Sequence, residues 1–421
     1  MPAKNLDQII LNIAKNARRA ALALQTVRPA AIDTALETMA KLLETEKTSL
    51  TRANARDLTA ARKYGMTPAM LDRLTLSDKT LASMIRGLRE VAKLTSPVSR
   101  EYDRRKRPNG LIIYKMRVPI GVVGIIYEAR PNVTVDAAAI CLKSHNAVIL
   151  RGGSEAFHSN MALVRLFSVA LRRAGLPKEA VQFVPTTDRK AVERLLKLDD
   201  YVDLIIPRGG EGLIRMVVEK STIPVIKHYK GVCHVYVAAS ANMKKAIPIV
   251  VNAKVQRPAV CNAMETLLLD KALSLVKKRE IVNALLEKGV TLFGDAESRR
   301  LSPAIQKATV DDWKAEYLDL RLALRIVSGV QQAIDHINSY GSHHTDAIVT
   351  ESVREAGLFL KEVDSASVMV NTSTRFSDGG EYGMGCEIGI STDKLHARGP
   401  MGVEDLTTYK WIVRGNGQVR K

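Results

Sequence analysis

The chain has 421 residues, enough for two or three domains, and its 46% apolar and 25% charged residues are ordinary values for a soluble globular protein. Aromatic residues make up 5%, which argues against a stacking surface for single-stranded nucleic acid, and no apolar run is long enough to span a bilayer. Lys and Arg outnumber Asp and Glu by 63 to 44, and the net charge of +19 favours either a nucleic-acid surface or small anionic ligands. Because no nucleic-acid-binding module accompanies the charge, we expect an anionic small-molecule substrate, no nucleic-acid partner and no membrane partner.

The first part of the chain, residues 4–95, is expected to form a succession of helices. Turn signals stand at Arg28-Pro29 and in GMTP (65–68). Apolar residues recur at helical spacing near the N-terminus, so an amphipathic helix is favoured there over a basic transit peptide.

From residue 111 the pattern changes to strands that alternate with helices. RPNG (107–110) predicts a hairpin turn before the first strand, and a long amphipathic helix is expected to end near Arg173. This alternation predicts a parallel sheet with helices on both faces. The expected strands are LIIYKMRV (111–118), GVVGIIYE (121–128), AVILRGG (147–153), VQFVP (181–185), DLIIPRGG (203–210) and PVIKHY (224–229).

A second α/β unit is expected to begin near residue 231. Its helices are expected at 241–254, where Pro258 must end the helix, and at 272–287. A glycine-rich segment (375–403) precedes a β-rich end, TTYKWIVRG (407–415). The expected strands of this unit are CHVYVAA (233–239), ETLLLD (265–270) and LALRIV (322–327).

Two of the expected strands end in a glycine pair after an arginine, LRGG (150–153) and PRGG (207–210). Glycines at the carboxyl end of a parallel strand let backbone amides approach a phosphate, and arginine binds phosphate in a bidentate manner. A tight turn that needs glycine is an equally good interpretation of either motif. Two such motifs in one sheet favour a nucleotide-binding domain.

The four cysteines, Cys141, Cys233, Cys261 and Cys386, lie far apart without a CxxC pair, which excludes a disulfide framework and fits a reducing compartment. Most free cysteines are packed and inert, and that is the expectation for Cys141 and Cys233. Cys261 differs because it lies where a terminated helix meets a strand, and such loops face clefts. The carboxyl end of the preceding helix disfavours a thiolate, so activation must come from Arg257, a cofactor's positive charge or backbone amides.

Histidine and serine chemistry are less favoured. His343 and His344 are neighbours, and adjacent residues in a strand point to opposite faces. The sequence has neither HExxH nor an acidic cluster at metal-ligand spacing, and GxSxG is missing too. We therefore expect no catalytic metal and no Ser–His–Asp hydrolase.

VQRPAVCNAMETLL (255–268) is part of a pattern that resembles the gamma-glutamyl phosphate reductase (glutamate-5-semialdehyde dehydrogenase) family of the aldehyde dehydrogenase superfamily. The resemblance runs nearly end to end. It also includes VPIGVVGIIYEARPNVTVDAAAICLKSHNAVILRGGSEA (118–156), DLIIPRGG (203–210), EYLDL (316–320), VQQAIDHINSYGSHHTDAIVT (330–350) and RFSDGGEYGMGCEIGISTDKLHARGPMG (375–402).

The resemblance implies two Rossmann-like α/β domains with parallel sheets and a β-hairpin for oligomerisation. The implied parts are a discontinuous cofactor domain (1–102 and 122–230), a catalytic domain (231–375), oligomerisation elements (103–121 and 405–421), and a return to the cofactor domain (376–404).

The resemblance also implies roles for single residues. Cys261 corresponds to the nucleophile and Asn132 to an oxyanion-stabilising amide. Arg151, Gly152, Gly153 and Ser154 correspond to the loop on the adenosine ribose and its 2′-phosphate, Gly209 and Gly210 to the segment beside the pyrophosphate, and Glu316 to a ligand of the nicotinamide ribose. No metal is implied.

The implied reaction is the NADPH-dependent reduction of L-glutamyl 5-phosphate to L-glutamate 5-semialdehyde through a Cys261 thioester, the second step of proline biosynthesis. The resemblance further implies a cytoplasmic homo-oligomer that uses NADPH/NADP+ and allows channelling of the acyl phosphate from glutamate 5-kinase. The alternative is a general hydrolytic aldehyde dehydrogenase. The stretch KHYKGVCHV (227–235) disfavours it, because the glutamate base that activates water in such enzymes is missing there. The chain departs from the family pattern at Ala238-Ala239, Ala259 and Cys386.

Overall fold

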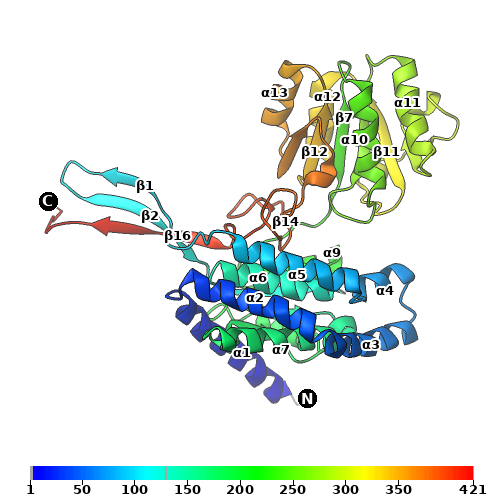
Figure 1. Cartoon of the computed structure of the whole chain (residues 1–421). Helices are drawn as coiled ribbons and strands as arrows, with labels where there is room; N and C mark the ends of the chain where they lie inside the picture. The colour runs from blue at the N-terminus through cyan, green and yellow to red at the C-terminus, as the bar shows by residue number, and fades with distance from the viewer. Residues whose placement is uncertain (1–2, 129, 421) are drawn as a thin grey trace. The chain divides into compact units, whose positions relative to one another are not determined.

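The computed structural model describes residues 3–128 and 130–420. The chain forms two compact units (Figure 1). Unit 1 contains Met1–Lys227, Gly383–Gly389 and Met401–Lys421, and unit 2 contains His228–Tyr382 and Ile390–Pro400. Within the described ranges no helix is both long enough and apolar enough to cross a membrane.

One expected boundary is wrong. The segment 376–404 was expected to return to the cofactor domain as a whole, but residues 376–382 and Ile390–Pro400 belong to unit 2. There β14 (Ile390–Ser391) pairs with β15 (Gly399–Pro400) in a small antiparallel sheet. Lys394 and Arg398 both form ion pairs with Asp364 of the same unit, at 2.7 and 2.8 Å. These contacts hold the middle of the segment on unit 2.

Unit 1 begins with five helices, in agreement with the sequence. They are α1 (Ala3–Leu24), α2 (Pro29–Thr45), α3 (Lys47–Lys63), α4 (Pro68–Leu74) and α5 (Asp78–Lys93). Proline opens α2 and α4, where a missing N–H costs nothing. The hydroxyls of Thr67 and Ser77 cap α4 and α5 by accepting backbone N–H groups.

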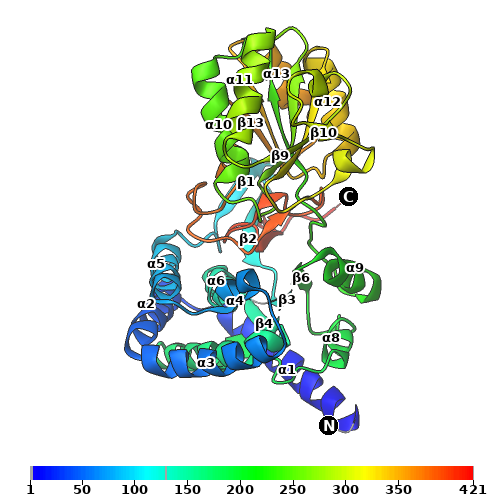
Figure 2. The ribbon, with the colours of Figure 1, turned by 90° about the vertical axis from the view of Figure 1, so that its right-hand side faces the viewer.

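The parallel sheet of unit 1 has four strands in the order β5-β4-β3-β6, and Figure 2 labels β4, β3 and β6. The chain runs from β3 to β5 in one direction and then returns to place β6 on the other side of β3, so the order reverses between β3 and β6. The strands are β3 (Val122–Tyr127), β4 (Ala147–Gly152), β5 (Val181–Phe183) and β6 (Leu204–Arg208), and the helices between and after them are α6 (Pro131–Lys143), α7 (Phe157–Arg173), α8 (Lys190–Leu195) and α9 (Glu211–Lys220).

The strand expected at 224–229 does not form. Val225 makes an isolated bridge to Ile205, and the chain passes into unit 2 at His228. Pro224 has no N–H to donate, so it contributes only its carbonyl, which accepts from the amide of Ile205 at 2.9 Å.

A separate antiparallel sheet joins β1 (Glu101–Lys106), β2 (Ile112–Pro119) and β16 (Thr407–Arg414) in the order β1-β2-β16. The hairpin turn predicted at 107–110 is confirmed: Gly110 has a φ of 87°, and the N–H of Arg107 donates to the carbonyl of Leu111 at 2.8 Å. The C-terminal strand β16 therefore completes the sheet that the hairpin begins.

Unit 2 is built on seven parallel strands in the order β10-β9-β11-β8-β7-β12-β13. The strands are β7 (Cys233–Val237), β8 (Met264–Asp270), β9 (Thr291–Gly294), β10 (Gln306–Lys307), β11 (Arg321–Val327), β12 (Thr345–Val349) and β13 (Ser367–Val370), and the main helices are α10 (Met243–Val255), α11 (Leu275–Leu286), α12 (Gly329–Tyr340) and α13 (Val353–Glu362).

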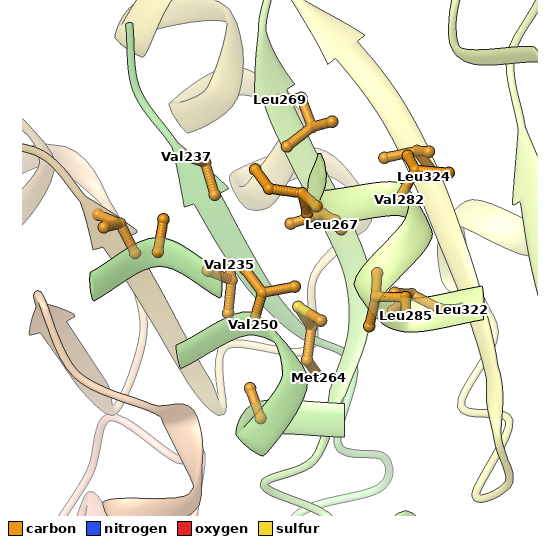
Figure 3. Packing of buried hydrophobic residues seen from close by; sticks show 14 of the residues in the cluster. Val235, Val237, Val250, Met264, Leu267, Leu269, Val282, Leu285, Leu322 and Leu324 are labelled. Carbon is orange, nitrogen blue, oxygen red and sulfur yellow. The ribbon is translucent and has the colours of Figure 1, made fainter. Parts of the chain in front are cut away.

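Alternation along the strands divides the core of unit 2 between two faces. Val235 and Val237 of β7 pack with α10 and α11, as Figure 3 shows, whereas Tyr236 packs with α12 and α13. Helices thus cover both faces of the sheet, as the sequence predicted.

Candidate active site

Unit 1 contains a cavity of about 500 Å³ at the carboxyl ends of β3 and β4. This volume lies within the range of small-molecule sites. The cavity lies where the strand order reverses, which is where open α/β sheets bind ligands. Its walls are formed by Ile126, Tyr127, Glu128, Arg151, Gly153, Ser154, Glu155, Thr187, Arg189, Val192, Glu193, Gly212, Leu213 and Met216.

The LRGG motif lies at this cavity, but its residues have different roles. The guanidinium of Arg151 is buried and donates to the carbonyls of Gly152 (2.9 Å) and Thr187 (3.1 Å). Burial lowers its pKa. Gly153 and Ser154 line the cavity, whereas Gly152 does not: a Cβ on Gly152 would lie 2.1 Å from Nδ2 of Asn160. Arg151 therefore holds the loop in place, and Gly152 is required for packing.

The PRGG motif leads directly into α9. Gly210 precedes the helix, and its N–H donates to Oε2 of Glu128 at 3.0 Å. A Cβ on Gly209 would lie 2.7 Å from the same carboxylate. An anion at the N-terminus of α9 would therefore meet Glu128, which must move aside to admit it.

Asn132 lies in the first turn of α6. Its Nδ2 donates to Oδ2 of Asp136, one turn along the helix, at 3.1 Å. Desolvation raises the pKa of Asp136 to about 6, and the hydrogen bond from Asn132 opposes that rise. The carboxyl group fixes the orientation of the amide.

Cys261 lies in unit 2 between α10 and β8, and two imidazoles lie beside it. One ligand-type atom from each of Cys261, His228 and His344 falls within 4.8 Å of the others. The three residues precede β8, β7 and β12, which are neighbours in the sheet and run parallel. Residues before adjacent parallel strands meet at the same edge, so the topology brings this cluster together at the amino edge of the sheet.

A second thiol supports this arrangement. Sγ of Cys233, the first residue of β7, donates to the carbonyl of Cys261 at 3.2 Å and lies 3.7 Å from Nδ1 of His344. Burial raises the pKa of Cys233 well above its usual value, so this thiol stays protonated. Cys141 is also buried, within α6, as the packing interpretation predicted. Cys261 is half-buried.

Positive charge also lies near the cysteine. Burial lowers the pKa of Arg375, and repulsion from Arg257 lowers this pKa further. Cys261 lies close enough to Arg375 to raise the same pKa. The Nε of Arg375 donates to Oε1 of Gln256 at 2.8 Å. Arg257, which the sequence singled out, thus acts together with a second arginine.

Gly231 lies against the backbone of the cysteine loop, and Glu316 holds Gly231 in place. The N–H of Gly231 donates to Oε1 of Glu316 at 2.8 Å. A Cβ on Gly231 would lie 1.9 Å from the carbonyl oxygen of Cys261 and 2.5 Å from its Cα. Only glycine lets the two backbone segments approach this closely.

Replacing Gly231 by Ala is therefore expected to displace Cys261, to lower kcat by about 10²-fold, since a shift of about 1 Å in a reacting group costs that much, and to slow alkylation of the thiol as it leaves its imidazoles. Steady-state kinetics and iodoacetamide labelling measure the two effects. Gly357→Ala in α13 is the matched control, because nothing lies within 4 Å of a Cβ there. Full activity and reactivity in Gly231→Ala would show that the loop tolerates the side chain.

The aldehyde dehydrogenase family model matches residues 3–319. The gamma-glutamyl phosphate reductase of Geobacter metallireducens is 54% identical over 412 residues, which cover 98% of this chain and 99% of that protein. The chain belongs to the gamma-glutamyl phosphate reductase family. A solved structure of gamma-glutamyl phosphate reductase from Thermotoga maritima is 43% identical, with a TM-score of 0.95 over 98% of this chain and 100% of that one. An acetylating aldehyde dehydrogenase from Geobacillus thermoglucosidasius, 19% identical over 99% and 98% of the two chains, shares the fold with a TM-score of 0.72.

The expected aldehyde dehydrogenase-like fold is thereby confirmed, and the chain is an oxidoreductase of this family. The structure gathers Arg151, Gly153 and Ser154 around the cavity in unit 1, and Cys261 and Glu316 around the loop in unit 2.

Sequence reasoning missed four neighbours: Arg189 at the cavity, and Gly231, His228 and His344 near Cys261. His344 was not expected at a site because the side chains of adjacent residues in a strand, here His343 and His344, point to opposite faces. The pair does diverge, since His343 turns to the carbonyl of Asp364, and this divergence leaves His344 with Cys261.

Proposed function

We propose that the protein reduces L-glutamyl 5-phosphate to L-glutamate 5-semialdehyde and phosphate with NADPH, in proline biosynthesis. The observation that carries the proposal is a half-buried cysteine beside two imidazoles and two arginines, in a chain 54% identical to a gamma-glutamyl phosphate reductase over 98% of its length. The arginines suit a substrate with a phosphate and a carboxylate.

The cavity of unit 1 fits a nicotinamide dinucleotide. It combines the topological switch point, glycines at the end of the LRGG strand, and the cationic side chains of Arg151 and Arg189, which lie among the carboxylates of Glu128, Glu155 and Glu193. Arg189 is exposed and suits the 2′-phosphate of NADPH, while Arg151 keeps the loop in shape through the carbonyls of Gly152 and Thr187. When bound, the cofactor supplies the hydride.

The residues of the chain perform the remaining chemistry. An imidazole of His228 or His344 takes the proton of the Cys261 thiol, and the thiolate attacks the acyl carbon. Asn132, oriented by Asp136, donates its second amide proton to the oxyanion. The C–O bond of the acyl phosphate then breaks, phosphate leaves, and a Cys261 thioester remains. After hydride addition to the thioester carbonyl, the C–S bond of the thiohemiacetal breaks, which gives the aldehyde and restores the thiolate.

Phosphate dependence tests this reaction. In the reverse direction, pyrroline-5-carboxylate and NADP+ are expected to give NADPH when phosphate or arsenate is present, and at least about tenfold less without either, because the thioester needs an oxyanion acceptor. Absorbance of NADPH measures the rate, and NAD+ in place of NADP+ measures the cofactor preference. A rate that does not depend on phosphate would instead identify a hydrolytic aldehyde dehydrogenase.

The proposal extends to assembly and location. Strand β16 forms one edge of its three-stranded sheet and exposes Tyr409, Trp411 and Val413, which supports a homo-oligomer joined through this edge. The reactive acyl phosphate favours channelling from glutamate 5-kinase in the cytoplasm. Light scattering of the purified protein measures the subunit number, and crosslinking with the kinase in cells tests the channelling and the compartment together.

A further inference from the structure

The cluster of Cys261, His228 and His344 has the composition of a metal site. One thiol and two imidazoles are the donors that Zn²⁺ prefers, and three protein ligands with one open position are typical of exchangeable zinc sites. No local motif predicts it, because the three donors come from separate segments without ligand spacing.

The geometry suits the size of the ion. In a tetrahedral zinc site, bonds of about 2.0–2.3 Å place neighbouring donors about 3.3–3.7 Å apart. The donors here all lie within 4.8 Å of one another, so side-chain rotations that close about 1 Å complete the site. His228 and Cys261 are half-buried, which leaves the site open to an ion from solvent, whereas His344 is buried.

The surroundings define which sulfur would be the ligand. Cys233 also lies near His344, but its Sγ donates to the carbonyl of Cys261 at 3.2 Å. The ring of His344 is fixed by contacts of Nδ1 with the hydroxyl of Thr345 at 2.9 Å and with Cys233. A fixed ring reduces the ordering needed to bind an ion.

We propose that Cys261, His228 and His344 bind Zn²⁺ and that the bound ion reversibly blocks the nucleophile. Binding replaces the thiol proton by the metal, so one proton is released and no electron is transferred. The ligated thiolate donates negative charge to the cation and is therefore a weaker nucleophile toward an acyl carbon.

The test uses protein freed of metal with a chelator and then titrated with ZnCl₂. Competition with a chromophoric chelator measures affinity and stoichiometry, and mass spectrometry of the iodoacetamide-treated protein measures alkylation of Cys261. We expect one high-affinity Zn²⁺ per chain and at least tenfold slower alkylation of Cys261 when zinc is bound, while MgCl₂ leaves alkylation unchanged. Neither measurement needs substrate, cofactor or turnover, so the result does not depend on the proposed reaction.

Matched variants locate the ion. His228→Ala and His344→Asn are each expected to weaken zinc binding by about 100-fold, since loss of a direct ligand costs at least as much as loss of an outer partner. His343→Asn is the control, because this neighbour contacts the carbonyl of Asp364 and asparagine tolerates its φ of 59°. Zinc binding of equal strength in Cys261→Ser, or zinc binding that leaves Cys261 open to alkylation, would overturn the proposal. Circular dichroism confirms that each variant is folded.

Discussion

Replacing Cys261 by Ser is expected to lower kcat of the phosphate-dependent reaction by about 10³-fold or more, because the hydroxyl is a far weaker nucleophile than a thiolate and forms no thioester. Serine has nearly the same size and keeps the backbone of the loop, so the protein is expected to fold and to keep its affinity for NADP+. Stopped-flow absorbance of NADPH measures the rate, and fluorescence quenching measures cofactor binding.

The control for this variant is Cys141→Ala. Cys141 is fully buried in α6 of unit 1, where its role is packing, so full activity is expected despite a small loss of stability. Undiminished activity in Cys261→Ser would remove Cys261 from the mechanism. Loss of NADP+ binding together with activity would instead show that the substitution disturbs more than the nucleophile.

The location of Cys261 shows what a sequence can predict about this site. Pro258 required the preceding helix to end, α10 ends at Val255, and β8 begins at Met264, so the placement of the cysteine in a loop between helix and strand was correct. The glycine pairs were likewise placed correctly, at the ends of β4 and β6. Such features are local, because one or two residues decide them.

The neighbours of Cys261 could not be predicted in the same way. Their meeting depends on the order of the strands in the sheet, and the chain places β8 and β12 on opposite sides of β7. Alternating strands and helices predict a parallel sheet but do not fix this order. The sequence does show that His228, Cys261 and His344 each precede a buried strand. Once the order of the strands in the sheet is known, this position places all three residues at one edge of the sheet.

The same limit applies to the segment 376–404. Its glycines predicted a loop, but ion pairs of Lys394 and Arg398 with Asp364 decide that its middle belongs to unit 2. Lys394 and Arg398 lie about thirty residues from Asp364 in the sequence, and many other acidic residues could have paired with them. Tertiary pairing of this kind leaves no local pattern in a single sequence.

A buried ion pair joins the helix and the strand that flank the cysteine loop. Nζ of Lys254, near the end of α10, lies 2.6 Å from Oε2 of Glu265 in β8, and both side chains are fully buried. Oε1 of Glu265 accepts the N–H of Leu318 at 3.2 Å, which fixes the loop that carries Glu316. Burial raises the pKa of Glu265 to about 7 and lowers that of Lys254, while their attraction opposes both shifts.

Lys254→Met is accordingly expected to lower the free energy of unfolding of unit 2 by about 3–5 kcal/mol, because it leaves a buried carboxylate without its cation. The double variant Lys254→Met/Glu265→Gln is expected to recover most of this loss, since glutamine is neutral and still accepts from Leu318. Fluorescence of the buried Trp313 during denaturant unfolding, in a Trp411→Phe background, measures the stability of unit 2.

The stability deficit of Lys254→Met should depend on pH, and the Glu265 carboxyl determines whether the deficit grows or shrinks as the pH rises. The pKa of this carboxyl is higher in the folded protein than in the unfolded chain, where it is about 4.3. Such a carboxyl contributes its full stability at pH values below the unfolded pKa. That stability is lost as the pH rises through the folded pKa. Without Lys254 the pKa of Glu265 rises further above 7, so the deficit of Lys254→Met should be small at pH 5 and largest at pH 8. The double variant has no such carboxyl, so its own stability should change less between pH 5 and pH 8 than that of Lys254→Met. A deficit of Lys254→Met that is equal at pH 5 and pH 8 would mean that lost packing of the lysine side chain, and not the unpaired charge, causes the instability.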